Sequence, residues 1–178
     1  MTVSESLQFF YKENNFPNDG GESKDFFELK FKLFTLKLPN SQFRKDVIHI
    51  HDIQHILYNC DTTWKGEAFI AGWEIATGLW KRFPIGFFSL WAMGFSLIFY
   101  PKEVFRGYKA GINTKGIIDL KIDKKTLLKL SLSELKKMIK KDKQQKLNWI
   151  TFLFWCFISE IFVLFPFLLF IVSVFYFL

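Results

Sequence analysis

The chain has 178 residues, enough for one domain with a hydrophobic core, and half of them are apolar. Its formal net charge of +7 suits nucleic acid or an anionic membrane surface as a partner. Its two cysteines, Cys60 and Cys156, have no paired spacing, which argues against a disulfide framework. Residues 1–24 contain four acids and no apolar run of signal-peptide length, so we expect no cleaved leader.

The N-terminal forty residues predict a short helix followed by a β-hairpin. Residues 4–14 have a helical pattern with Ser4 or Ser6 as the cap. After a Pro/Gly-rich break, apolar and charged residues alternate over 26–38. The alternation changes phase at Leu33, which predicts a bulge or a tight hairpin there.

Two helices are predicted next, over 41–59 and 64–82. At 100° per residue, the first helix carries one apolar stripe, formed by Phe43, Val47, Ile50, Ile53 and Leu57. His51, Asp52 and His55 form a polar face beside this stripe, whereas the third histidine, His49, points elsewhere.

The two histidines at positions i and i+4 can share one divalent ion. Because the loop after them is short, the next helix should be an antiparallel neighbour, and its Glu67 can supply a third ligand. Asp52 is either a fourth ligand or a general base. Mixed nitrogen and oxygen donors suit zinc, iron or manganese. The alternative is an ordinary polar interface between two helices.

The spacing His51-Asp52-x-x-His55 followed by Glu67 resembles the signature of the Coq4 family of ubiquinone-biosynthesis proteins. Four further stretches resemble its bacterial members: Phe16 to Gly21, Thr62 to Ala68, Gly72 to Glu74, and Phe105 to Gly111. The resemblance covers about residues 7–140.

This resemblance implies a mostly helical protein on the inner face of an energy-transducing membrane. It implies a divalent ion, usually zinc, held by His51, Asp52, His55 and Glu67, with Asp52 and Glu67 as acid/base candidates. Glu74 lies seven residues after Glu67 on the same face of the second predicted helix and would be a supporting carboxylate. The implied partners are a polyprenyl quinone precursor and other quinone-biosynthesis enzymes, because eukaryotic members organise these enzymes and are linked to modification of the ring at its carboxyl-bearing carbon.

The remaining charges and apolar runs fit a lipid substrate. Residues 85–100 lack charge and predict a core helix or the wall of a prenyl-binding groove. Arg44 on the histidine face, and Arg106 and Lys109 on a short helix over 102–111, are candidates for a lipid headgroup. Solvated surface charge is the alternative reading.

The C-terminal part of the sequence predicts a membrane segment. Residues 121–146 contain ten lysines and three acids, and residues 147–178 contain no Lys or Arg. If the apolar run inserts into a bacterial inner membrane, we expect the lysines on its cytoplasmic side. We therefore do not expect nucleic acid as a partner. The apolar run is either one long helix or a hairpin kinked near Glu160 and Pro166.

The sequence therefore predicts a mainly α fold with a small N-terminal β-hairpin and a C-terminal hydrophobic membrane tail. A helical domain spans residues 1–140, and a basic linker with the membrane segment spans 141–178. The expected function is that of a Coq4-like protein that binds a metal and a prenylated quinone precursor, as enzyme or presenting scaffold. The alternative is a metal-dependent hydrolase of a membrane phosphoester.

Overall fold

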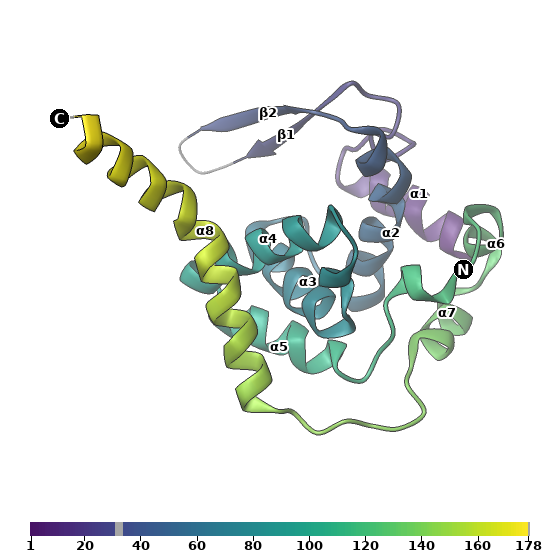
Figure 1. Cartoon of the computed structure of the whole chain (residues 1–178). Coiled ribbons are helices and arrows are strands. Elements are labelled where there is room, and N and C mark those ends of the chain that lie inside the picture. Colours follow the sequence, from purple (N-terminus) through teal and green to yellow (C-terminus); the bar gives the residue numbers. More distant parts are fainter. Residues whose placement is uncertain (31–33, 178) are drawn as a thin grey trace. The chain divides into compact units, whose positions relative to one another are not determined.

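The computed structural model describes residues 1–30 and 34–177 and confirms a mainly α fold with one small β-hairpin and an apolar C-terminal helix. The bulge or turn predicted at Leu33 lies outside the described residues. Figure 1 shows the elements, whose bounds are α1 (Val3–Glu13), β1 (Phe26–Lys30), β2 (Thr35–Pro39), α2 (Gln42–Tyr58), α3 (Trp64–Thr77), η1 (Leu79–Lys81), α4 (Ile85–Phe99), α5 (Pro101–Gly111), η2 (Ile117–Leu120), α6 (Lys124–Lys129), α7 (Leu132–Ile139) and α8 (Trp149–Phe177).

The chain divides into two compact units. The first contains Met1–Asn59 and Lys121–Lys136, and the second contains Cys60–Leu120 and Lys137–Leu178. The first unit therefore holds α1, the hairpin, α2 and α6, and the second holds α3, α4, α5 and α8.

Helix α1 begins with a capping box that differs from the predicted cap. Thr2 is extended, its hydroxyl accepts from the Glu5 amide at 3.2 Å, and Glu5 Oε2 accepts from the Thr2 amide at 2.8 Å. The predicted caps Ser4 and Ser6 are wrong, because Ser6 is buried in the helix and donates to the Thr2 carbonyl at 2.7 Å. Helix α1 then packs against α2 and α6.

The predicted hairpin is confirmed as an antiparallel pair. Phe27 pairs with Leu38 and Leu29 with Leu36, which keeps the apolar side chains in register across the two strands. Asn40 ties the end of β2 to the preceding loop, since its side-chain amide donates to two loop carbonyls at 3.0 and 2.7 Å.

Helix α2 confirms the helix predicted over 41–59. The Ser41 hydroxyl accepts from the Arg44 amide at 3.3 Å, and Asn59 ends the helix in the left-handed conformation.

The predicted apolar stripe of α2 is only partly right. Ile53 and Leu57 are buried, but the earlier members of the stripe are half-buried: Phe43, Val47 and Ile50. The polar-face residues Asp52 and His55 are buried as well. The second half of α2 is thus buried on more than one face, because α1 packs against it.

Helix α3 is shorter than the predicted helix over 64–82. It begins after the cap Thr63 and ends at Thr77, because Gly78 adopts a left-handed φ of 92°. The 3₁₀ helix η1, which is one turn long, follows.

Helices α3 and α5 form a close interface in the second unit (Figure 1). A Cβ placed on Gly107 of α5 would lie 1.9 Å from the Phe69 carbonyl oxygen of α3, so only glycine fits at this crossing.

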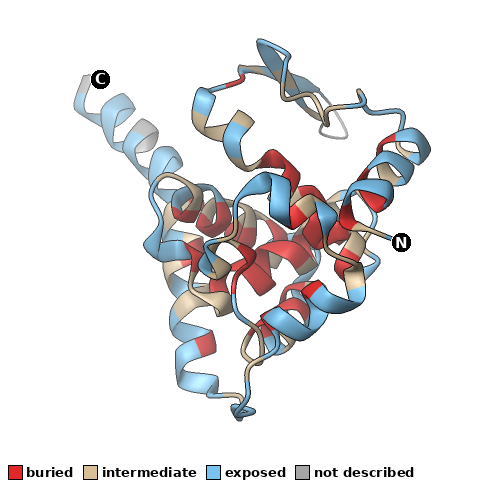
Figure 2. Ribbon diagram, turned by 90° about the vertical axis from the view of Figure 1, so that its right-hand side faces the viewer, coloured by how far each residue is buried: buried red, intermediate tan, exposed pale blue. Residues whose placement is uncertain are grey.

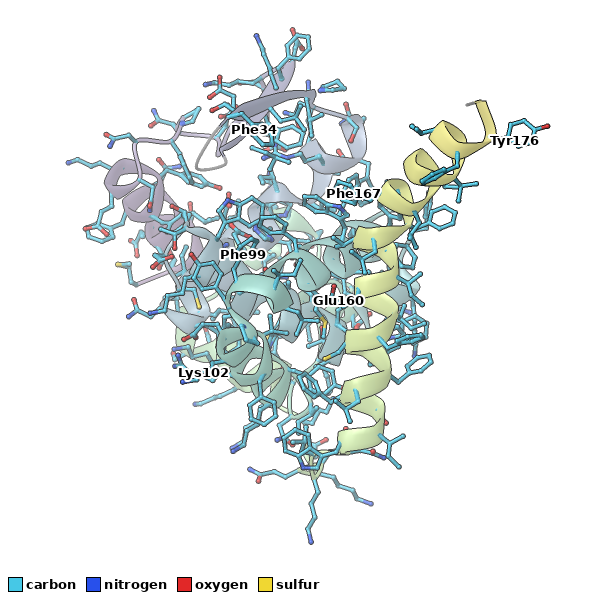
Figure 3. All side chains as sticks on the ribbon, turned by 90° about the vertical axis from the view of Figure 1, so that its left-hand side faces the viewer. Phe34, Phe99, Lys102, Glu160, Phe167 and Tyr176 are labelled. Carbon is cyan, nitrogen blue, oxygen red and sulfur yellow. The ribbon has the colours of Figure 1, made fainter. Side chains whose placement is uncertain are left out.

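Helix α8 is continuous from Trp149 to Phe177 through Pro166, so the long single helix describes the apolar run and the hairpin does not. Its N-terminal half packs on α4 with Ser159 and Val163 against Gly94. Phe152 contacts the rings of Phe105 and Tyr108 of α5. From Leu164 onward its described residues are exposed. The part of the ribbon that leads to the C-terminus is accordingly pale blue in Figure 2. Figure 3 shows Phe167 and Tyr176 projecting from this exposed half.

The helix is long and apolar enough to cross a membrane. Its 29 residues correspond to about 44 Å at 1.5 Å per residue, which exceeds the hydrocarbon thickness of a bilayer.

Substitution of Gly107 by alanine tests the α3–α5 contact. Helix propensity alone favours alanine by about 1 kcal/mol, but the methyl group would meet the Phe69 carbonyl, so we expect a net loss of about 2 kcal/mol in the free energy of unfolding. Denaturant unfolding followed by circular dichroism measures it. Gly116→Ala is the control, since the nearest atom there belongs to the movable Asp119 side chain at 3.0 Å. An unchanged or raised stability of Gly107→Ala would show that the helices do not cross so closely.

Candidate metal-binding site

Two histidines of α2 bring their ring nitrogens together. His51 and His55 are four residues apart, and their Nε2 atoms lie 3.3 Å from one another, with ring planes inclined at 70°. Two nitrogens bound tetrahedrally to one ion at 2.0–2.1 Å are separated by about 3.3–3.4 Å. The distance is that of a hydrogen bond between the two imidazoles, and it equals the spacing of two ligands on one metal ion.

The orientation of His55 is fixed by α1. Its ring stacks on Phe10 with centroids 6.0 Å apart and planes inclined at 28°, and the residue is 2% exposed. His51 is half-buried. One imidazole is thus held by packing, and the other lies nearer the surface of the unit.

Asp52 lies beside the pair as a buried carboxylate. It is 5% exposed, and within the described part of the chain its Oδ2 has no hydrogen-bond partner. Burial raises the pKa of the Asp52 carboxyl, and His51, the Tyr11 hydroxyl, His55 and Arg44 oppose this rise. A buried carboxylate oxygen without a partner is costly unless a cation or a donor compensates it, which fits a metal ion at this place.

Tyr11 and Gly20 form the wall next to Asp52. A Cβ on Gly20 would lie 2.7 Å from the Tyr11 hydroxyl oxygen and 2.9 Å from Asp52 Oδ2, and Gly20 has a left-handed φ of 66°. Only glycine therefore lets the loop approach the carboxylate. Burial, followed by the charge of Asp52, raises the pKa of the Tyr11 hydroxyl, so Tyr11 stays protonated at neutral pH.

The loop carrying Gly20 is braced by Asp19. Its carboxylate oxygens accept from the amides of Gly21 at 2.9 Å and Ser23 at 2.8 Å. These hydrogen bonds, those of Ser23 first, lower the pKa of Asp19 to about 2.

His49 is separate from the pair, as the helical phase predicts. It is 7% exposed, and burial lowers its pKa to about 4, so it is neutral at physiological pH. Its Nδ1 has no hydrogen-bond partner in the described structure.

Arg44, predicted as a headgroup residue, makes contacts within its own unit. Its guanidinium donates to Asn40 Oδ1 at 3.1 Å and lies over the Phe27 ring at 4.1 Å. Burial lowers its pKa and the charge of Asp52 raises it. Arg44 therefore links the hairpin to the helix that bears the histidines.

The other candidate residues lie in the second unit. Glu67 is half-buried in the first turn of α3, and Glu74 is buried and accepts from the Ser89 hydroxyl at 2.6 Å. Arg106 pairs with Glu103 at 2.6 Å on the exposed side of α5, and Lys109 is exposed. His51, His55 and Glu67 are a group of side chains that could hold a metal ion.

Three residues of this site escaped sequence reasoning: Phe10, Tyr11 and Gly20. The first two read only as apolar positions of a short helix, and Gly20 as part of a loop. The signal available was the stretch Phe16 to Gly21, which the family resemblance picked out without giving it a role.

Comparison of the chain with protein-family models, with curated proteins and with solved structures finds no match.

Proposed function

We propose that this chain is a Coq4-like protein that holds one divalent ion at the membrane and handles a prenylated quinone precursor beside it. The ligands are His51, His55 and Glu67, with Asp52 as the neighbouring carboxylate. The observation that carries the proposal is the 3.3 Å separation of the two Nε2 atoms on α2.

The donor set suits a metal ion that binds both nitrogen and oxygen ligands. Two imidazole nitrogens and a carboxylate oxygen would supply three protein ligands, which is the number found in catalytic zinc sites. We propose zinc as the ion, although iron and manganese bind the same nitrogen and oxygen donors. Glu67 is the third donor we propose, because only Asn59 to Thr63 separate the end of α2 from the start of α3 along the chain.

The chemistry follows from these residues. A bound divalent ion would polarise a carboxyl or hydroxyl oxygen on the ring of the substrate. Asp52 is placed to accept a proton, because its carboxylate is buried and its Oδ2 has no hydrogen-bond partner among the described residues. The protonated Tyr11 hydroxyl lies next to this carboxylate, and burial followed by the charge of Asp52 raises the Tyr11 pKa. Glu67 serves as a ligand or as a second proton acceptor.

The long apolar helix supports a membrane location. Helix α8 has a single charged side chain, Glu160, and follows the basic stretch over 121–146. We propose that α8 inserts into a bacterial inner membrane with the lysines on the cytoplasmic side. A lipid substrate with a polyprenyl tail would reach the protein from that membrane, where other quinone-biosynthesis enzymes would be its partners.

Metal analysis of purified variants tests the ligand set. We expect about one ion per wild-type chain, and at least about tenfold weaker binding in His51→Ala, His55→Ala and Glu67→Gln, because each removes one donor. Inductively coupled plasma mass spectrometry measures the content. His49→Gln is the matched control, since it removes a histidine of the same helix that lies outside the pair, and should keep its ion. Equal metal content in wild type and all variants would refute the site.

The lipid extract of a deletion strain tests the pathway. We expect an early prenylated benzoate to accumulate and ubiquinone to fall, and we expect wild type and His49→Gln, but not His51→Ala, to restore the pool. Liquid chromatography with mass spectrometry measures both lipids. An unchanged quinone pool would reject the quinone assignment and favour hydrolysis of a membrane phosphoester at the same residues.

A further inference from the structure

A cavity of about 510 Å³ lies within the second unit, where α8 begins. It is lined by the end of α3, the turn η1, the end of α5, the basic linker and the first two turns of α8. Its volume falls in the range of small-molecule sites. None of these residues belongs to the candidate metal site.

The cavity is lined by three lysines, Lys81, Lys141 and Lys146. No Asp or Glu is among its described lining residues. The Lys141 ammonium is held in place, because it donates to the Ile112 carbonyl at the end of α5 at 2.9 Å. Lys141 is half-buried, and this burial lowers the pKa of its ammonium group. The Asn148 side chain caps α8, and the positive end of that helix dipole faces the same space.

An aromatic wall adjoins these lysines. Trp80 and Trp155 lie with ring centroids 4.6 Å apart, and Lys81 Nζ lies 5.2 Å from the centre of the Trp80 ring. Tryptophan next to lysine at the end of an apolar helix is the composition of a membrane interface, where the rings lie at the level of the headgroups.

An exposed apolar stripe leads from the cavity along α8. Phe154 lines the cavity, and Ile161 and Leu168 follow at seven-residue intervals on the same side of the helix. They are 52%, 43% and 56% exposed, respectively. Acyl chains of a lipid whose headgroup occupies the cavity would run along this stripe.

We infer that this cavity is a binding site for one anionic glycerophospholipid, with its phosphate at Lys81, Lys141 and Lys146 and its glycerol against Trp80 and Trp155. The inference rests on the proposed insertion of α8 and is independent of the metal site. Its function would be to fix the depth and rotation of α8 relative to the helices of the second unit, since α3, α5 and α8 all contribute to the cavity.

Native mass spectrometry of the full chain tests this site. Protein reconstituted in bilayers of equal phosphatidylglycerol and phosphatidylcholine and released into mild detergent should retain one phosphatidylglycerol, preferred about tenfold over phosphatidylcholine. The triple variant K81Q/K141Q/K146Q should lose this preference. The charge-matched control K125Q/K129Q/K137Q, which removes three exposed lysines outside the cavity, should keep it.

Three outcomes would overturn the proposal. The first is equal retention of both lipids by wild type. The second is an equal loss of the lipid preference in both triple variants, which would indicate an effect of bulk charge. The third is displacement of the lipid by excess glycerol 3-phosphate, which would indicate a site for free phosphate. A titration of wild type with brominated lipids needs no variant: brominated phosphatidylglycerol should quench tryptophan fluorescence at lower concentration than brominated phosphatidylcholine, and equal quenching would contradict the site. His51→Ala should bind lipid normally, so failure of the metal site and failure of the lipid site are distinguishable.

Discussion

Burial of the polar face of α2 is the constraint on which the first unit depends. Asp52 and His55 are 5% and 2% exposed, although aspartate and histidine are usually more exposed to solvent. A buried carboxylate and imidazole cost several kcal/mol unless charge or hydrogen bonding compensates them. Helix α1 supplies part of the compensation through Tyr11, and stacking by Phe10 orients one imidazole. A divalent ion shared by the α2 histidines would supply further compensation.

The second unit follows a different constraint, the close approach of helix backbones. At Gly107 the α5 backbone meets the Phe69 carbonyl, and the aromatic side chains then gather around the start of α8. The exposed half of α8 has no such packing among its described residues. The second unit therefore combines a packed set of helices with one long apolar helix whose described second half is exposed.

Much of this could be predicted from the sequence, because local signals are strong where caps and periodicity agree. The cap Ser41 and the break at Asn59 predicted the two ends of α2, and the alternation over 26–38 predicted the hairpin. Periodicity overestimated α3, since it continues through Gly78 whereas the backbone turns there. For the site, spacing found His51 and His55, but the burial of Asp52 and the roles of Phe10, Tyr11 and Gly20 depend on how α1 and its loop pack against α2. That packing joins residues about forty positions apart, and no local pattern records it.

X-ray absorption spectroscopy at the metal edge of the purified full chain tests the central claim most directly. If His51 and His55 share an ion, the spectrum will show two imidazole nitrogens at about 2.0–2.1 Å together with oxygen ligands. His51→Ala will lose one imidazole, and His49→Gln will lose none. A chain without stoichiometric metal, or a spectrum with no imidazole scattering, would contradict the account.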